Sequence, residues 1–270
     1  MPKIDLHTHS MFSDGTCPPE EVVCKALKTG VRIFALTDHD TTAGVLRAQQ
    51  ICREHNILFT PGVEISTREH DHLHFTGYRF DLTNKEFQDF LAQNRQNRQN
   101  RIRQIICQLQ QAGVDITEHD VFSRASNSVS RAHVADALKA KKIVSSRQEG
   151  FKKYLLPGRA GYVPSAGVTA LEAIRYIKKA GGIAVIAHPG LVSEAWNFPA
   201  WKEAGLDGIE VFYPAHSFAL KQDLLALARK YGLFCSGGSD YHGPRGGRVT
   251  APGMEIPQTN YDRIYQVLFG

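Results

Sequence analysis

Imidazole and carboxylate side chains recur at the ends of strand-like segments in this sequence. The first such segment, KIDL, runs directly into His7 and His9, and Asp14 follows in the next loop. Because alternate residues of an extended chain point to the same face, both imidazoles can face one point. This spacing is typical of metal ligands, although two hydrogen-bonded structural histidines would have the same spacing.

Five further segments place the same residue types at or near their ends, after or within FALT, TPGVEIS, HLHFTGY, IAVIA and LFCSGGS. The nine candidate metal ligands are His7, His9, Asp14, His39, Glu64, His74, His188, Asp240 and His242. In parallel β/α barrels the loops after the strands converge on one rim, where the chemistry is placed. Asp38 and Asp40, which flank His39, are candidates for orienting its imidazole.

The candidate ligands include no thiol, which suits Zn²⁺, Fe²⁺ or Mn²⁺. One catalytic metal takes about three protein ligands plus water, so nine ligands indicate roughly two or three ions. A carboxylate such as Glu64 could bridge them. Several cations together can clamp the attacking and leaving oxygens of a displacement at phosphorus and lower the pKa of water. The ligand set therefore predicts hydrolysis of a phosphate ester.

Strand-like and helix-like segments alternate through residues 1–83 and 164–270, which predicts an α/β fold with a parallel sheet or barrel. Residues 84–163 are different, because their patterning is mostly helical and includes one long helix ending at Gly113. We therefore predict a helical subdomain, residues 84–163, that is inserted into the α/β domain and shapes its substrate pocket.

Composition narrows the class of protein without identifying a substrate. The 270 residues are 42% hydrophobic and 22% charged, as in ordinary globular proteins. Five scattered cysteines without CxxC spacing argue against a disulfide framework and a thiolate zinc site, and favour the cytoplasm. The N-terminus is too polar for a signal peptide, and no apolar stretch approaches the ~20 residues of a membrane span. The net charge of +5 suits an anionic ligand.

Five motifs, DLHTHSMFSDG, TDHDT, GVEIS, AHPG and GSDYH, closely resemble those of the PHP (polymerase and histidinol phosphatase) domain, in the same order. The resemblance implies a distorted seven-stranded β/α barrel and often a trinuclear metal site. We expect two or three divalent ions, with Mn²⁺ favoured over Zn²⁺ or Fe²⁺.

The resemblance also assigns ligands to each ion. It implies one ion held by His7, His9, Glu64 and Asp240, a second by Asp14, His39 and His242, and a third by Glu64, His74 and His188. His72 is an alternative to His74, because both lie on one strand face. His74 is preferred, since it precedes Gly77 by three residues, as in the family.

Within the family, the insert with SRAH and FKKYLLPGRAGYVP resembles that of stand-alone nucleotide and RNA phosphoesterases. This branch implies hydrolysis of 3′,5′-nucleotide bisphosphates of the pAp type, or of short 5′-monophosphorylated RNA in the 5′→3′ direction. A neighbouring phosphate would lie in a basic pocket. The expected partners are a nucleotide or a short single-stranded RNA, with no membrane and no obligate protein partner.

Arg131 and His133 begin a helix, where free N–H groups and an arginine can bind a phosphate. The alternative is a Ser130 cap beside a solvated arginine. The resemblance favours phosphate contact by Arg131 and places Lys153 and Arg159 on the other side of the same pocket.

His216 follows a strand and could reach the substrate or protonate a leaving group. With Arg131 and His133, it completes the set of candidate catalytic residues.

Tyr162 could stack on a base, but a structural tyrosine is equally consistent. The arginines Arg95, Arg98, Arg101 and Arg103 could follow an RNA backbone. A solvated helix face is the favoured interpretation of these four.

Three other functions are compatible with parts of the sequence. A histidinol-phosphate-type monophosphatase would share the metal motifs, but the helical insert argues against it. A non-catalytic nucleic-acid-binding or metal-storage module would have a degenerate barrel, and the presence of a ligand residue at all nine positions argues against degeneration. An amidohydrolase would normally use a bridging carbamylated lysine, and no lysine stands at a strand end to supply one.

Overall fold

The computed structural model describes residues 1–244 and 249–270. Nine strands of this part of the chain form two sheets, with the orders β3-β2-β1-β9 and β4-β5-β6-β7-β8. The first sheet consists of β1 (Lys3–Asp5), β2 (Val31–Phe34), β3 (Leu58–Phe59) and β9 (Met254–Glu255). The second consists of β4 (Gly62–Ser66), β5 (His74–Tyr78), β6 (Ile183–Ile186), β7 (Gly208–Phe212) and β8 (Phe234–Gly237).

Strand pairing in the two sheets is mixed. β1, β2 and β3 pair in parallel, as do β6, β7 and β8, whereas β5 is antiparallel to both β4 and β6. Isolated parallel bridges, Thr8 to Tyr241 and His39 to Glu64, connect the segments that follow the strands. The predicted α/β fold is confirmed. The distorted seven-stranded barrel is not confirmed, because in the described part of the chain the continuous ladders group into two sheets.

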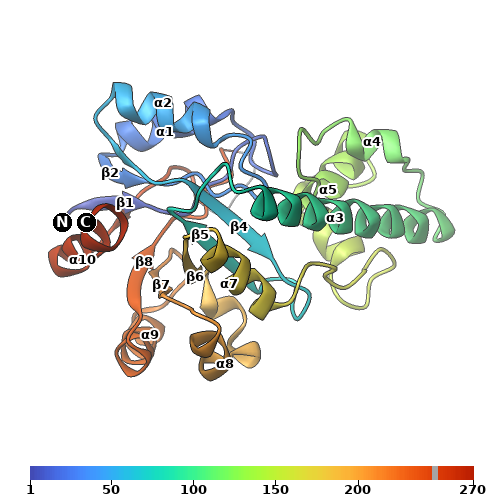
Figure 1. Ribbon diagram of the computed structural model, residues 1–270. Coiled ribbons are helices and arrows are strands. Elements are labelled where there is room, and N and C mark those ends of the chain that lie inside the picture. The colour runs from blue at the N-terminus through green and yellow to red at the C-terminus, as the bar shows by residue number, and fades with distance from the viewer. Residues whose placement is uncertain (245–248) are drawn as a thin grey trace.

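Helices cover both outer faces of the sheets (Figure 1). α1 (Pro19–Lys28) and α2 (Val45–Glu54) lie together on the first sheet, and α7 (Ala170–Lys179), α8 (Phe198–Glu203) and α9 (Phe218–Tyr231) lie by the second. α10 (Gln258–Phe269) contacts β8. α7 begins with a capping box between Thr169 and Glu172, and its apolar face packs on β5 and β6. In residues 1–244 and 249–270, no helix combines the length and the hydropathy that a membrane span needs.

The region between β5 and α7 is helical and projects from the end of the molecule opposite the termini (Figure 1). It contains α3 (Lys85–Gln111), α4 (Glu118–Phe122), α5 (Arg131–Ala140), α6 (Arg147–Gly150) and a π-helical turn, Phe151–Leu155. Its buried apolar residues form a cluster of their own, which runs from Ile102 to Val163. This cluster supports the predicted insert at 84–163, although the exact boundaries remain a prediction.

The long helix α3 belongs to two of the three hydrophobic clusters that the described residues form. Phe87, Phe90 and Leu91 near its start pack into the core around the second sheet, whereas Ile105 and Leu109 near its end pack into the core of the insert. Asn84 caps the helix by accepting a hydrogen bond from the backbone N–H of Phe87. α3 therefore fixes the insert relative to the ends of the strands, where the candidate ligands lie.

Candidate metal centre and adjoining pocket

The nine predicted metal ligands come together from six separate segments of the chain. Four groups have ligand atoms within 4.8 Å of one another: His9, Asp14, His39 and His242; His7, His9 and Asp240; His7, Glu64 and His188; and His39, Glu64 and His74. His7, His9 and Glu64 are almost completely buried. The alternative ligand His72 belongs to none of these groups, so His74 is the histidine of β5 that joins the cluster.

The segments after β1 and β8 place His7, His9 and Asp240 side by side. The backbone N–H of Asp240 donates to the His7 carbonyl at 2.8 Å, and the N–H of His9 donates to the Tyr241 carbonyl at 2.8 Å. Gly238 permits this close approach, because a Cβ at that position would lie 2.2 Å from the His7 Cβ. A larger residue at 238 would displace the ligand segment.

Glu64 lies at the centre of the cluster. Its Oε1 is 2.9 Å from Nδ1 of His74 and 3.0 Å from Nε2 of His188. Its Oε2 is 3.0 Å from Nδ1 of His39 and 3.3 Å from Nε2 of both His7 and His9. One carboxylate thus faces five imidazoles, which is the arrangement that a bridging ligand requires.

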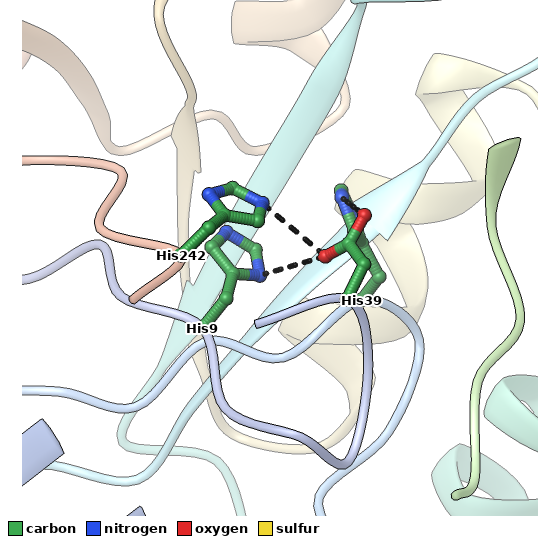
Figure 2. Close-up of side chains that lie close together, drawn as sticks. His9, His39 and His242 are labelled. Carbon is green, nitrogen blue, oxygen red and sulfur yellow. Dashed lines mark ion pairs between the residues drawn. The ribbon is translucent and has the colours of Figure 1, made fainter. Parts of the chain in front are cut away.

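A second part of the cluster surrounds the carboxylate of Asp14. His9, His39 and His242 converge there from three different segments (Figure 2). Nε2 of His242 lies 3.2 Å from Asp14 Oδ1, and Nε2 of His39 lies 3.8 Å from Asp14 Oδ2. The rings of His9 and His242 stack with their centroids 4.1 Å apart.

The donor atoms in this cluster fit divalent cations. Among the described residues, ten buried side-chain nitrogen or oxygen atoms have no hydrogen-bond partner. Six of the ten belong to predicted ligands: His7 Nε2, His9 Nε2, Asp14 Oδ1, His39 Nδ1, Glu64 Oε2 and His188 Nδ1. A buried polar atom without a hydrogen bond costs about 1–3 kcal/mol. Several of these atoms have only ion-pair contacts with one another, so their concentration at one point fits a site that binds cations. Imidazole and carboxylate donors without thiols suit Mn²⁺, Fe²⁺ or Zn²⁺.

The electrostatics of the cluster also favour positive charge. Burial disfavours ionisation of Glu64, but the imidazoles of His39, His7 and His74 outweigh it and hold its pKa well below the usual range. Burial likewise opposes a charge on His9, yet the carboxylates of Asp240 and Glu64 raise its pKa to about 10. Since metal ligands bind in their deprotonated forms, a cation here would take the place of such protons.

Glu210 is a residue of the centre that our sequence interpretation missed. Nδ1 of His7 lies 3.2 and 3.3 Å from its two carboxylate oxygens, and the backbone N–H of His188 donates to its Oε2 at 2.7 Å. His188 has a positive φ of 28°, so the same carboxylate holds a strained backbone in place. The only sequence signal was an acidic residue within the apolar strand GIEVF.

Asp38 and Asp40 fix the ligand loops instead of the His39 ring. Asp38 accepts hydrogen bonds from the hydroxyls of Ser10 and Ser13, both at 2.6 Å. Asp40 accepts from the backbone N–H of Ser66 at 3.1 Å. No hydrogen bond within residues 1–244 and 249–270 joins either carboxylate to His39, so the predicted orienting contact is not present.

A pocket of about 220 Å³ adjoins the cluster. Seven of the predicted ligands line one part of it: Asp14, His39, Glu64, His74, His188, Asp240 and His242. The β4–β5 loop contributes Asp71 and His72, and the insert contributes Arg98, Arg101 and Arg131. The metal cluster and a group of arginines therefore share one cavity, although they come from different parts of the fold.

The three arginines are largely buried and held by acceptors. Arg98 donates to Asp40 at 3.2 Å and to the Val129 carbonyl at 3.0 Å. Arg101 and Arg131 donate to the two oxygens of Asp71 at 2.6 and 2.9 Å. The side chains of Arg98 and Arg101 are both 13% exposed, so the favoured interpretation of these two as a solvated helix face was wrong.

The two predicted catalytic histidines, His133 and His216, lie away from the cavity lining. Nδ1 of His133 accepts the N–H of Ser130 at 3.0 Å as part of a capping box. Nδ1 of His216 donates to the Val211 carbonyl at 3.0 Å, and its Nε2 accepts the N–H of Gly190 at 3.2 Å. These contacts give each histidine a structural role, and a role in proton transfer stays a prediction.

The structure does not bring Lys153 and Arg159 to the arginine pocket. Both are exposed, and Lys153 lines a separate hollow beside Lys141. The physical reason is the π-helical turn Phe151–Leu155, which presents Phe151 to the cavity and leaves Lys153 at the surface. Tyr162 is also absent from the described lining of the cavity.

Comparison with known proteins agrees with this geometry. The PHP domain family matches residues 5–182. A 3′,5′-nucleoside bisphosphate phosphatase from Chromobacterium violaceum is 34% identical, with 95% of this chain and 93% of the relative covered. The 5′-3′ exoribonuclease Rnm from Escherichia coli is 36% identical, with 89% and 85% covered.

A solved structure with the same fold comes from Bifidobacterium adolescentis and is described as a candidate metal-dependent phosphoesterase. It superposes with a TM-score of 0.88 at 29% identity, covering 97% of this chain and 95% of that chain. The resemblance seen in the sequence motifs is thus confirmed, and the chain belongs to the PHP domain family.

Proposed function

We propose that this chain is a metal-dependent phosphoesterase that hydrolyses 3′,5′-nucleotide bisphosphates, short 5′-monophosphorylated RNA in the 5′→3′ direction, or both. The observation that carries the proposal is the shared cavity, in which a cluster of metal ligands faces three arginines. The relatives support it, because two of them are named as a nucleoside bisphosphate phosphatase and a 5′-3′ exoribonuclease.

The cluster would hold two or three divalent ions, with Mn²⁺ as our first choice and Zn²⁺ or Fe²⁺ as alternatives. The four geometric groups supply the ligands, and Glu64 and His9 each belong to more than one region of the cluster. When bound, such ions lower the pKa of water and neutralise charge that develops on phosphoryl oxygens. The protein itself supplies a buried, fixed set of donor atoms.

The arginines would bind the second phosphate of the substrate. Within the described residues, Nη2 of Arg98, Nη1 of Arg101 and Nη2 of Arg131 form no hydrogen bond, so each guanidinium retains a donor. Hydrogen bonds to a charged group contribute roughly 1.5–3 kcal/mol each. Substrates with a second phosphate are therefore expected to bind far better than those with one, and the insert that carries these arginines sets substrate choice.

Product analysis tests this proposal most directly. Purified protein with Mn²⁺ would be given pAp, a 5′-phosphorylated trinucleotide, AMP and histidinol phosphate side by side. Release of orthophosphate from pAp, or stepwise release of mononucleotides from the trinucleotide, with little turnover of AMP and histidinol phosphate, is the expected result. Preferential hydrolysis of histidinol phosphate would favour the monophosphatase alternative, and no hydrolysis at all would favour a binding module.

We propose a cytoplasmic location on the chemistry of the cysteines. All five are free thiols, and Cys17 and Cys52 are buried. Unpaired buried thiols fit a reducing compartment, where disulfides are rare.

A further inference from the structure

Asp71 stands between two arginines that line the cavity. Its Oδ1 accepts a hydrogen bond from Nη2 of Arg101 at 2.6 Å, and its Oδ2 accepts from Nη1 of Arg131 at 2.9 Å. Asp71 belongs to the β4–β5 loop, Arg101 to the middle of α3, and Arg131 to the start of α5. One carboxylate therefore connects three segments that are far apart in the sequence.

The two guanidinium groups would repel each other without this carboxylate. The Arg101, Arg131 and Asp71 side chains are only 13%, 10% and 9% exposed, so water screens their charges weakly. Burial and the neighbouring charge of Arg131 lower the pKa of Arg101 to about 10, even though Asp71 opposes this shift. Like charges in such a setting stay close only when an anion lies between them.

Asp71 leaves part of each guanidinium free for a ligand. Arg101 also donates through Nε and Nη2 to the Val163 carbonyl, which fixes the plane of its guanidinium. Arg131 donates to the Leu155 carbonyl and lies 5.7 Å from the centre of the Phe151 ring. Both groups are thus held in one orientation while they line the cavity beside the metal cluster.

We propose that Asp71 is a positioning residue that sets the preference for substrates with a second phosphate, by holding Arg101 and Arg131 in a preformed anion site. This inference rests on the proposed function and goes further, because it assigns the selectivity to a residue outside the four groups of candidate metal ligands. The competing idea is that Asp71 is a resident anion that substrate phosphate must displace.

The two ideas predict opposite effects of Asp71→Asn. An asparagine has nearly the same shape, but its single carbonyl oxygen can accept from only one guanidinium, and it carries no charge. If Asp71 positions the arginines, the KM for pAp rises about tenfold, whereas kcat/KM for p-nitrophenyl phosphate, which has no second phosphate, stays unchanged. Asp71→Glu keeps the charge and should restore part of the lost affinity for pAp.

A matched control is Asp89→Asn, which removes an exposed acid of α3 that pairs only with Lys85 among the described residues. This variant should leave both substrates unaffected. A lower KM for pAp in Asp71→Asn would overturn the proposal in favour of a resident anion. Equal losses on both substrates, or unchanged kinetics, would overturn it as well.

The same assay separates this inference from the function beneath it. If the unmodified protein hydrolyses AMP as well as pAp, the proposed function fails before Asp71 is considered. If the unmodified protein strongly prefers pAp and Asp71→Asn keeps that preference, only the role of Asp71 fails.

Discussion

At the scale of single residues, the centre depends on side chains that hold the ligands as much as on the ligands. His7 presents Nε2 to the cluster because its Nδ1 is engaged by Glu210. The same carboxylate holds the backbone of His188. Acceptors of this kind fix the tautomer and orientation of metal-binding histidines.

Replacing Glu210 by alanine is therefore expected to weaken metal binding. We expect the affinity for Mn²⁺ to fall about 10–100-fold, the usual effect of removing such a support. Equilibrium dialysis with metal analysis measures this directly, without an activity assay. Glu203→Ala, which removes an exposed acid of α8, should bind Mn²⁺ like the unmodified protein. Unchanged binding by Glu210→Ala would show that His7 does not need this support.

Cysteine reactivity provides a second prediction at this scale. Burial raises the pKa of the Cys52 thiol to about 12, whereas Cys107 is exposed. Only the thiolate reacts, so at pH 8 about one Cys52 thiol in ten thousand is reactive. Between about pH 9 and 12 the folded state keeps this proton, whereas the unfolded state loses it. The contribution of Cys52 to the free energy of unfolding should therefore fall as pH rises through this range.

Labelling with a thiol-specific disulfide reagent at pH 8 tests this expectation. Cys107 should react rapidly, and Cys52 only after the protein is denatured. Cys107→Ser should remove the fast phase. Rapid modification of Cys52 in the folded protein would contradict the burial of this side chain of α2.

The nine ligand positions could be predicted from the sequence because each lies within or soon after an apolar strand segment. Glu210, Asp71 and the buried positions of Arg98 and Arg101 could not. Their partners come from distant segments, and an arginine on a polar helix looks the same in sequence whether it faces water or a cavity. Lys153 and Arg159 show the converse, because a basic residue in the right motif can still face solvent.

At the scale of elements, α3 determines where the arginines stand. Its first turns pack with α7 around Phe90 and Tyr176, whose rings stack at 4.1 Å. Its last turns pack into the core of the insert. The helix could be predicted from its pattern and from Gly113 at its end. The mixed strand pairing around β5 could not, because an apolar strand carries no signal of its direction.

Truncating a buried side chain in the core of the insert should lower the stability of the protein. Ile105 is fully buried, so Ile105→Ala is expected to lower the free energy of unfolding by about 2–5 kcal/mol. Urea denaturation measures this change. Gln104→Ala, on the exposed side of the same turn, should change it by less than about 0.5 kcal/mol. Equal effects of the two substitutions would contradict the packing of Ile105 into the core of the insert.

At the scale of the whole molecule, α3 joins the hydrophobic core around the second sheet to the core of the insert, and the site lies where these two cores meet the ends of the strands. The α/β class and the helical insert followed from the order of the sequence patterns. The grouping of the strands into two sheets could not be predicted. It depends on which neighbouring strands form continuous hydrogen bonding, and strands as short as β1 and β3 carry too little pattern to show this.

Metal removal should destabilise the whole fold. Buried donors from six segments lie close together, and their carboxylates have pKa values lowered by imidazoles that surround them. A ligand that binds only the folded state stabilises it by about 2.7 kcal/mol at a concentration of 100 Kd. We therefore expect Tm to fall on chelation and to recover with Mn²⁺. An unchanged Tm would argue that no ion joins these segments.

The central claim is that these side chains enclose divalent cations beside the arginine pocket. Anomalous scattering from a crystal grown with Mn²⁺ tests it most directly. We expect two or three peaks within the cluster, each bounded by ligands of one of its groups and at least one in contact with Glu64. A fully occupied data set with no peak there, or with the imidazoles turned away from one another, would contradict it.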